Sequence, residues 1–225
     1  MTVVTTTHRT TPGLVDPSQI TTIFLEAIPA MGEADQRLTR TLYQMLSRGK
    51  PVSFANLGKI LSRPENELVE TLNDWPGIFY DDNNDVIGFW GITVQPTGHC
   101  MDIDGITTYT WCAWDSLFIP ELVGETAHIT SKCEQSGEEI TLTVSPDGAI
   151  AESHKDVVVS FVIPTAEELR TNVTASFCHF VYFFKDRQAG ETWLENHEGV
   201  FLLTLDEAFA AGKKLNAARF NLTPD

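Results

Sequence analysis

Several absences in this sequence exclude whole classes of protein. Lysine and arginine number 15 against 31 aspartates and glutamates, which gives a formal net charge of −16. Because proteins neutralise phosphates with lysine and arginine, this deficit argues against a nucleic-acid partner. No apolar run approaches the roughly 20 residues that a membrane-spanning helix needs. We therefore predict a protein that binds neither nucleic acid nor membrane.

The N-terminus lacks the pattern of an export signal. Residues 1–17 are rich in threonine and contain neither a basic region nor an apolar stretch that follows it. We interpret residues 1–19 as a mobile tail and predict a cytoplasmic location.

The cysteines of this sequence show no paired spacing. The four cysteines are Cys100, Cys112, Cys133 and Cys178. In a chain without an export signal we expect thiols rather than disulfides. No pair shows the Cys-x-x-Cys spacing, which argues against both a zinc site and a thioredoxin-type dithiol.

Residues 20–95 predict a small helical module that ends in a hairpin. Apolar residues recur at helical spacing over residues 20–27, 37–47, 53–61 and 62–75, and residues 78–80 and 86–94 predict two strands. Ser53 and Ser62 are expected to cap the third and the fourth of these helices. The order of helices and hairpin resembles a winged helix-turn-helix. All charged residues between Pro64 and Gln95 are acidic, however, so a phosphate backbone would repel this module. We interpret it as a structural module packed on a catalytic core, which argues against a DNA-binding metal sensor.

Residues 96–225 predict a catalytic core built from strands and helices. Strands are expected at residues 101–103, 107–110, 127–132, 140–144, 157–163 and 177–184. A turn at Asp104 and Gly105 is expected to join the first two strands into a hairpin. Helices are expected at residues 112–122, 165–171, 191–197 and 205–217. The predicted fold class is therefore α+β, with the winged-helix-like module beside a mixed β-sheet flanked by helices.

The segment from Tyr109 to Asp115 contains the residues best suited to chemistry. If Cys112 begins a helix, Asp115 lies on the same helical face. A helix N-terminus favours a thiolate, and a carboxylate beside it can accept the thiol proton. Alternatively, Cys112 is a small core residue and Asp115 caps the helix. These residues alone leave both interpretations open.

A set of ordered motifs resembles the alkylmercury lyase family over about residues 37–216. The motifs are Tyr109-x-Trp111-Cys112-Ala113-x-Asp115, Ile119-Pro120, Gly124-x-Thr126-Ala127, Cys133, Leu142-Thr143-Val144-Ser145-Pro146, Ser176-Phe177-Cys178-His179 and Glu207-Ala208-Phe209. Cys-x-x-Asp alone is not specific, but the order and spacing of the whole set are.

The resemblance implies an organomercurial lyase, which splits a carbon–mercury bond into a hydrocarbon and mercury(II) for detoxification. The family's two mercury-binding cysteines fall on Cys112 and Cys178, and its catalytic aspartate, a further candidate ligand, falls on Asp115. Mercury(II) is a soft ion that prefers thiolates. In the mechanism that the resemblance implies, Asp115 first accepts a thiol proton and then delivers it to the carbon atom. The resemblance implies no organic cofactor; cellular thiols or a mercuric reductase would receive the mercury(II).

Other residues and other functions fit the sequence less well. Cys133 resembles a structural position of the family, and Cys100 matches no site. Trp114 and His179 depart from the family pattern, which bears on the substrate range. A serine or cysteine hydrolase lacks a Gly-x-Ser-x-Gly motif. A protein that only sequesters mercury needs the same cysteines but has no use for Asp115.

Overall fold

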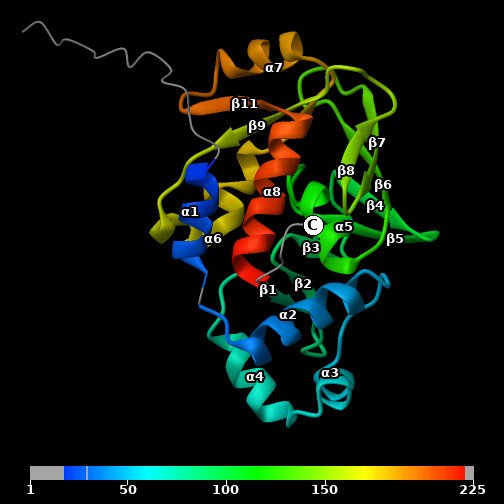
Figure 1. Cartoon of the computed structure of the whole chain (residues 1–225), viewed down its shortest axis with the longest axis vertical. Coiled ribbons are helices and arrows are strands. Elements are labelled where there is room, and N and C mark those ends of the chain that lie inside the picture. Colours follow the sequence, from blue (N-terminus) through cyan, green and yellow to red (C-terminus); the bar gives the residue numbers. More distant parts are fainter. Residues whose placement is uncertain (1–17, 29, 221–225) are drawn as a thin grey trace, which may run out of the picture.

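The computed structural model describes residues 18–28 and 30–220, which form eight α-helices and eleven strands (Figure 1). The predicted α+β class is confirmed. Of the tail predicted for residues 1–19, residues 1–17 lie outside the described residues, and the last two belong to helix α1 (Ser18–Ala27). No helix of the described ranges is both long and apolar enough to cross a membrane.

Eight strands form one sheet, in the order β1-β2-β3-β5-β4-β6-β7-β8. Its strands are β1 (Ile78–Tyr80), β2 (Val86–Phe89), β3 (Ile92–Thr93), β4 (His99–Ile103), β5 (Ile106–Thr110), β6 (Ala127–Lys132), β7 (Glu139–Ser145) and β8 (Gly148–Ala151). The predicted turn at Asp104 and Gly105 joins β4 to β5, and both residues have positive φ, as a two-residue hairpin requires.

A second sheet of three strands has the order β10-β9-β11. Its strands are β9 (Val158–Val162), β10 (Phe183–Phe184) and β11 (Val200–Thr204). Among the described strands, every pairing in both sheets is antiparallel, so the predicted mixed sheet is wrong. The reason is local: many consecutive strands are joined by short turns, and a short turn brings the next strand back antiparallel.

The N-terminal helices follow the predicted order. They are α2 (Glu33–Leu46), α3 (Phe54–Leu61) and α4 (Glu65–Asn73), and they lie at one end of the molecule (Figure 1). Ser53 caps α3 through its side chain, as predicted. Ser62 was expected to cap the next helix, but it ends α3 with φ 54°, and Pro64 precedes α4 instead. The winged-helix likeness of this region stays a prediction.

The predicted division at residues 95 and 96 also stays a prediction. Strands from both sides of it share one sheet, because β3 pairs with β5 through Ile92 and Thr110. The single strand expected at residues 86–94 is two strands. A turn at Trp90 and Gly91, both with positive φ, separates β2 from β3.

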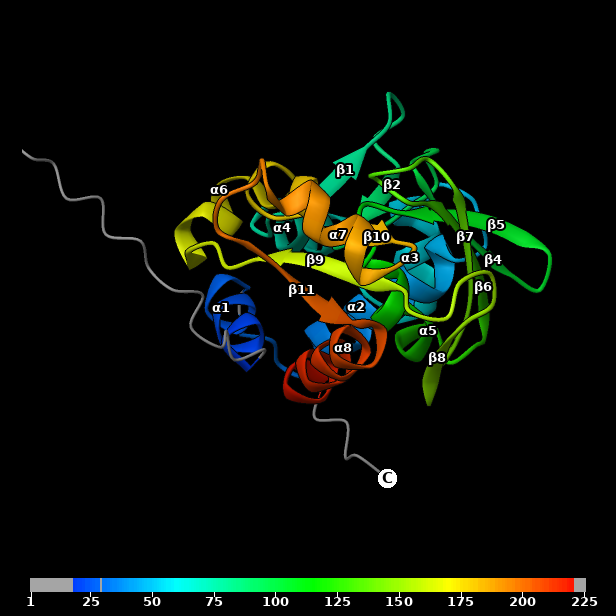
Figure 2. The ribbon, with the colours of Figure 1, turned by 90° about the horizontal axis from the view of Figure 1, so that it is seen from above.

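Helices cover the remaining core. They are α5 (Asp115–Val123), α6 (Ala166–Ser176), α7 (Arg187–Leu194) and α8 (Leu205–Phe220). Helix α1 packs against both α6 and α8, and α8 also packs against α5 (Figure 2). Gly212 allows the close contact between α8 and α5, since a Cβ there would lie 2.7 Å from the Cβ of Phe118. Thr165 begins α6 with a capping box that includes Glu168.

Candidate functional site

Cys112 lies in the short connection between β5 and α5. The helix that we expected to begin at Cys112 begins at Asp115. The Cys112 amide donates a hydrogen bond of 3.0 Å to Asp115 Oδ2, and its carbonyl accepts one of 3.0 Å from the Thr110 hydroxyl. The hydrogen bond from the Cys112 amide to Asp115 thus closes a short loop of residues 112–115 at the start of α5. This contact fixes the carboxylate beside the cysteine, although the two residues do not share a helix.

Cys178 comes from a segment that the sequence predicted as a strand. Residues 177–184 instead form a 3₁₀ turn (Cys178–Phe180) followed by the short β10. The buried Ser160 hydroxyl donates to the Phe180 carbonyl at 2.7 Å and accepts from the Tyr182 amide at 3.0 Å. The Ala113 amide donates to the Val181 carbonyl at 3.2 Å. These bonds join the two cysteine segments although 66 positions separate Cys112 from Cys178.

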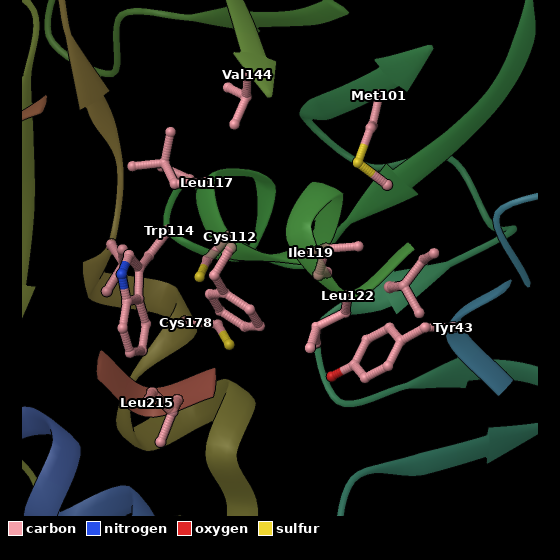
Figure 3. Packing of buried hydrophobic residues seen from close by; sticks show 14 of the residues in the cluster. Tyr43, Met101, Cys112, Trp114, Leu117, Ile119, Leu122, Val144, Cys178 and Leu215 are labelled. Atoms are coloured by element: carbon pink, nitrogen blue, oxygen red, sulfur yellow. The ribbon is translucent and has the colours of Figure 1, made fainter. Parts of the chain in front are cut away.

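The structure brings the three predicted site residues together. One sulfur each from Cys112 and Cys178 and one oxygen from Asp115 all lie within 4.8 Å of one another. No other group of three or more histidine, cysteine or acidic side chains with this geometry occurs among the described residues. Exposure is 0% for Cys112, 4% for Cys178 and 7% for Asp115. Figure 3 shows the two cysteines next to each other inside the core.

Burial and mutual contacts shift the pKa of all three groups. Burial raises the pKa of Asp115 to about 6, against the opposing effect of its hydrogen bonds with Cys112. Burial, the hydrogen bond to Cys178 and the negative charge of Asp115 raise the pKa of Cys112 well above the ordinary value. The hydrogen bond from Cys112 lowers the pKa of Cys178, but burial and Asp115 outweigh it, so the pKa is raised. At neutral pH the carboxylate is therefore the proton acceptor of the cluster.

Gly91 makes room for the Asp115 carboxylate. A Cβ at residue 91 would lie 2.4 Å from Asp115 Oδ1, and Gly91 has φ +101°, a conformation that other residues rarely adopt. The Gly91 carbonyl accepts a hydrogen bond of 2.9 Å from the Trp111 amide. Glycine thus meets both a steric and a backbone requirement at this position.

A mostly apolar cavity of about 50 Å³ opens beside the cluster. Asp115 and Cys178 line it, whereas Cys112 is not among its lining residues. Most of its wall consists of apolar side chains from α1, α5, α6, α8, the turn between β2 and β3, and the segments next to these elements: Phe24, Ala27, Ile28, Trp90, Trp111, Phe118, Leu169, Val173, Phe177 and Leu215. The space exceeds the roughly 10–15 Å³ that one water molecule needs. Such a wall suits an apolar organic group next to the thiols.

Other residues singled out in the sequence lie away from the cluster or behind it. Trp114 is fully buried, donates to the Ala208 carbonyl at 2.8 Å and is not among the cavity's lining residues. Cys133 is buried at a turn, where its backbone bonds with Glu138 and Gly137. His179 is exposed. All four cysteines are free, as expected.

Two residues that line the cavity escaped the sequence analysis. One is Gly91, and the only feature that could have marked it is its position after Trp90, inside a segment that was expected to be one strand. Arg219 is the other; it lies 104 positions beyond Asp115, near the end of α8, and no local motif marks it.

Comparisons with known proteins identify the family to which this chain is similar. The model of the family described as MerB, alkylmercury lyase, matches residues 92–217. An alkylmercury lyase of Staphylococcus epidermidis is 36% identical over 180 residues, which cover 80% of this chain and 82% of that protein. An alkylmercury lyase of Streptomyces lividans is 35% identical over 202 residues, covering 89% and 92%.

A solved structure has the same fold. It is the mercury-bound form of MerB2, which matches with a TM-score of 0.73 and 19% identity over 88% of this chain and 97% of that one. Together with the family match and the curated relatives, this likeness confirms the predicted resemblance: the chain belongs to the alkylmercury lyase family and is a carbon–mercury lyase.

Proposed function

We propose that Cys112, Cys178 and Asp115 carry out the cleavage of organomercury compounds by this lyase. The observation that supports this assignment is the position of two thiols and one carboxylate within 4.8 Å of one another, all buried. Two thiolates suit mercury, and the carboxylate supplies the proton transfer that simple sequestration does not need.

Cys178 reacts first with the mercury of R–Hg–SR′. It lines the cavity, and Cys112 donates a hydrogen bond that favours its thiolate form. The Cys178 sulfur forms a bond to mercury, the bond between mercury and the incoming thiolate breaks, and the Cys178 proton leaves with R′SH. The product of this step is R–Hg bound to Cys178.

Cys112 and Asp115 then act together. The Cys112 thiol gives its proton to the Asp115 carboxylate, and the resulting thiolate becomes the second sulfur ligand of mercury. Two sulfur ligands increase the electron density on the carbon atom. Asp115 delivers the proton to that carbon, the carbon–mercury bond breaks, and R–H leaves. Asp115 is again a carboxylate, and mercury(II) stays bound to Cys112 and Cys178 with Asp115 as a possible third ligand.

Exchange completes the cycle. Two cellular thiols protonate the cysteines and remove mercury(II) as their own dithiolate, or a mercuric reductase accepts it. The three side chains and the cellular thiols provide every proton and ligand in these steps, so the proposed cycle uses no organic cofactor. The four free thiols suit the reducing conditions of the cytoplasm, where we expect this chemistry to occur.

Gas chromatography of the headspace tests the assignment. Purified protein with methylmercury and excess thiol should release methane, and Cys178→Ser should release none. Cys100→Ser is the matched control, because Cys100 is a partly exposed thiol outside the cluster, and it should retain the wild-type rate. Wild-type release by the folded Cys178→Ser variant would contradict the proposal.

A further inference from the structure

Arg219 is a buried cation in the wall of the same cavity. Its residue is 7% exposed, and it lines the cavity together with Asp115 and Cys178. It lies near the C-terminal end of α8, one turn after Leu215, which also lines the cavity and is labelled in Figure 3 below Cys178. Arginine remains protonated in proteins, so this position brings a fixed positive charge to an otherwise apolar wall.

Aromatic side chains hold the Arg219 guanidinium in place. Its central carbon lies 4.3 Å from the centroid of the Trp90 ring and 5.2 Å from that of Phe220. The Tyr43 hydroxyl forms a hydrogen bond with the guanidinium and donates one of 2.9 Å to the Trp90 carbonyl. These contacts orient the planar group without neutralising its charge.

One edge of the guanidinium has no partner. Within the described part of the chain, Nε and Nη2 are buried and form no hydrogen bond, and Arg219 forms no ion pair. Nε and Nη2 point in nearly the same direction, so their two N–H groups match the two oxygens of a carboxylate. A buried, unpaired charge is unfavourable, and an anionic ligand would remove that cost.

The surroundings leave room for such a ligand. Arg219 and Ile28 line both the cavity at the cluster and a second hollow of about 290 Å³ that includes Met31 and Gln36. A group attached to mercury can therefore extend from the thiols towards Arg219, because Cys178 and Arg219 line the same cavity. We propose that Arg219 binds a carboxylate group of the organomercury substrate and so selects substrates that carry one.

This inference rests on the proposed site at Cys112, Cys178 and Asp115, because that site determines where the mercury lies. The carboxylate has two chemical sources. It belongs either to the organic group, as in a carboxyphenylmercury compound, or to the thiol that arrives bound to mercury, as in a mercaptopropionate complex. The proposed recognition is the same in both, and the experiment separates them.

The test compares substrates that differ only in the carboxylate. The first ratio is kcat/KM for 4-carboxyphenylmercury over phenylmercury, both with 2-mercaptoethanol. The second is kcat/KM for phenylmercury with 3-mercaptopropionate over that with 2-mercaptoethanol. A hydrogen bond to a charged group implies that Arg219→Gln lowers one of the two ratios about tenfold to a hundredfold. A fall in the first identifies the organic group as the source, and a fall in the second identifies the thiol.

Arg40→Gln is the matched control. Arg40 also lies over the Phe220 ring, at 5.6 Å, but it is not among the residues lining the cavity. Both ratios should keep their wild-type values in this variant. Arg219→Lys keeps the charge but lacks the two parallel N–H groups that bind both oxygens of a carboxylate, so it should lower the same ratio as Arg219→Gln. The lysine variant replaces the glutamine variant in this test if the glutamine variant does not fold.

Both ratios staying within twofold of wild type in a folded Arg219 variant would overturn the inference. An equal loss of kcat/KM for substrates with and without the carboxylate would also overturn it. The proposed site is tested separately. It fails if Cys178→Ser still releases benzene from uncharged phenylmercury, whatever the two ratios show.

Discussion

The carboxylate of Asp115 lies in the space that a side chain on Gly91 would occupy. A Cβ at residue 91 would be 2.4 Å from Asp115 Oδ1 and 2.6 Å from its Cγ, and the backbone there has φ +101°. The turn between β2 and β3 therefore determines where the proposed proton carrier can sit. This relationship explains why a turn outside the cysteine motifs matters to the site.

Gly91→Ala should displace the Asp115 carboxylate and lower kcat/KM for methane release at least tenfold, since 1.4 kcal/mol of lost positioning already has that effect. Mercury(II) binding should persist, because both cysteines remain. Gly98→Ala is the control, as a Cβ there meets nothing within 4 Å. Methane release and mercury retention measured on the same preparation check the prediction. Unchanged methane release by Gly91→Ala would contradict it.

Asp115 should also control the pH dependence of cleavage. Burial raises its pKa to about 6, and only the carboxylate form accepts the Cys112 proton. We expect kcat/KM to be nearly constant above this pH and to fall about tenfold for each pH unit below it. A pH profile from 4.5 to 8 measures this, with circular dichroism to show that the fold persists. A profile with no change near pH 6 would argue against Asp115 as the proton acceptor.

The same carboxylate should reduce the stability of the fold at neutral pH. Its folded pKa of about 6 exceeds the ordinary value of 3.8, so the folded protein holds this proton more tightly than the unfolded chain does. The contribution of protonated Asp115 to the free energy of unfolding is therefore fully present below about pH 3.8 and is lost as the pH rises through about 6. By pH 8 the loss is on the order of 3 kcal/mol.

Asp115→Asn removes this charge and can still accept the hydrogen bond from the Cys112 amide. We expect the variant to be more stable than the wild type at pH 8 and the difference to shrink as the pH falls towards 5. Urea unfolding at several pH values measures it. The variant should bind mercury(II) yet release no methane. An equal stability difference at pH 5 and pH 8 would contradict the assigned pKa.

Local sequence patterns, formed by residues close together in the chain, predicted much of this structure. Helical spacing located α1 to α4, the Asp104–Gly105 turn located the β4–β5 hairpin, and the motifs named Cys112, Asp115 and Cys178. Residues whose role depends on distant contacts could not be found this way. Arg219 meets Trp90 and Tyr43 only through the packing of α8 on the N-terminal region. The strand expected at residues 177–184 was wrong because its apolar side chains are buried around a turn, where an apolar run looks the same as a strand.

The order in which the cysteines react is a further prediction. Cys178 lines the cavity and Cys112 does not, so Cys178 should take R–Hg from the incoming thiol complex by itself. Cys112→Ser should therefore accumulate a covalent R–Hg adduct on Cys178 and release little hydrocarbon. Cys178→Ser should form no such adduct at Cys112 on the same timescale. Intact-protein mass spectrometry followed by peptide mapping identifies the modified cysteine; an adduct mainly on Cys112 in the wild type would reverse the proposed order.

Ser160 should position Cys178 through the backbone. Its hydroxyl bonds both the Phe180 carbonyl and the Tyr182 amide, and the serine is fully buried. Ser160→Ala removes both hydrogen bonds from the Phe180 carbonyl and the Tyr182 amide, so the free energy of unfolding should fall by about 1–3 kcal/mol. If the bonds also fix Cys178, the rate of R–Hg transfer to that cysteine should fall while the Asp115-dependent pH profile keeps its midpoint. Ser153→Ala serves for comparison, because the Ser153 hydroxyl accepts one exposed hydrogen bond from the Thr141 amide and lies outside the cluster. This variant should change neither the free energy of unfolding nor the rate of R–Hg transfer. A loss of stability in Ser160→Ala with an unchanged transfer rate would limit Ser160 to a structural role.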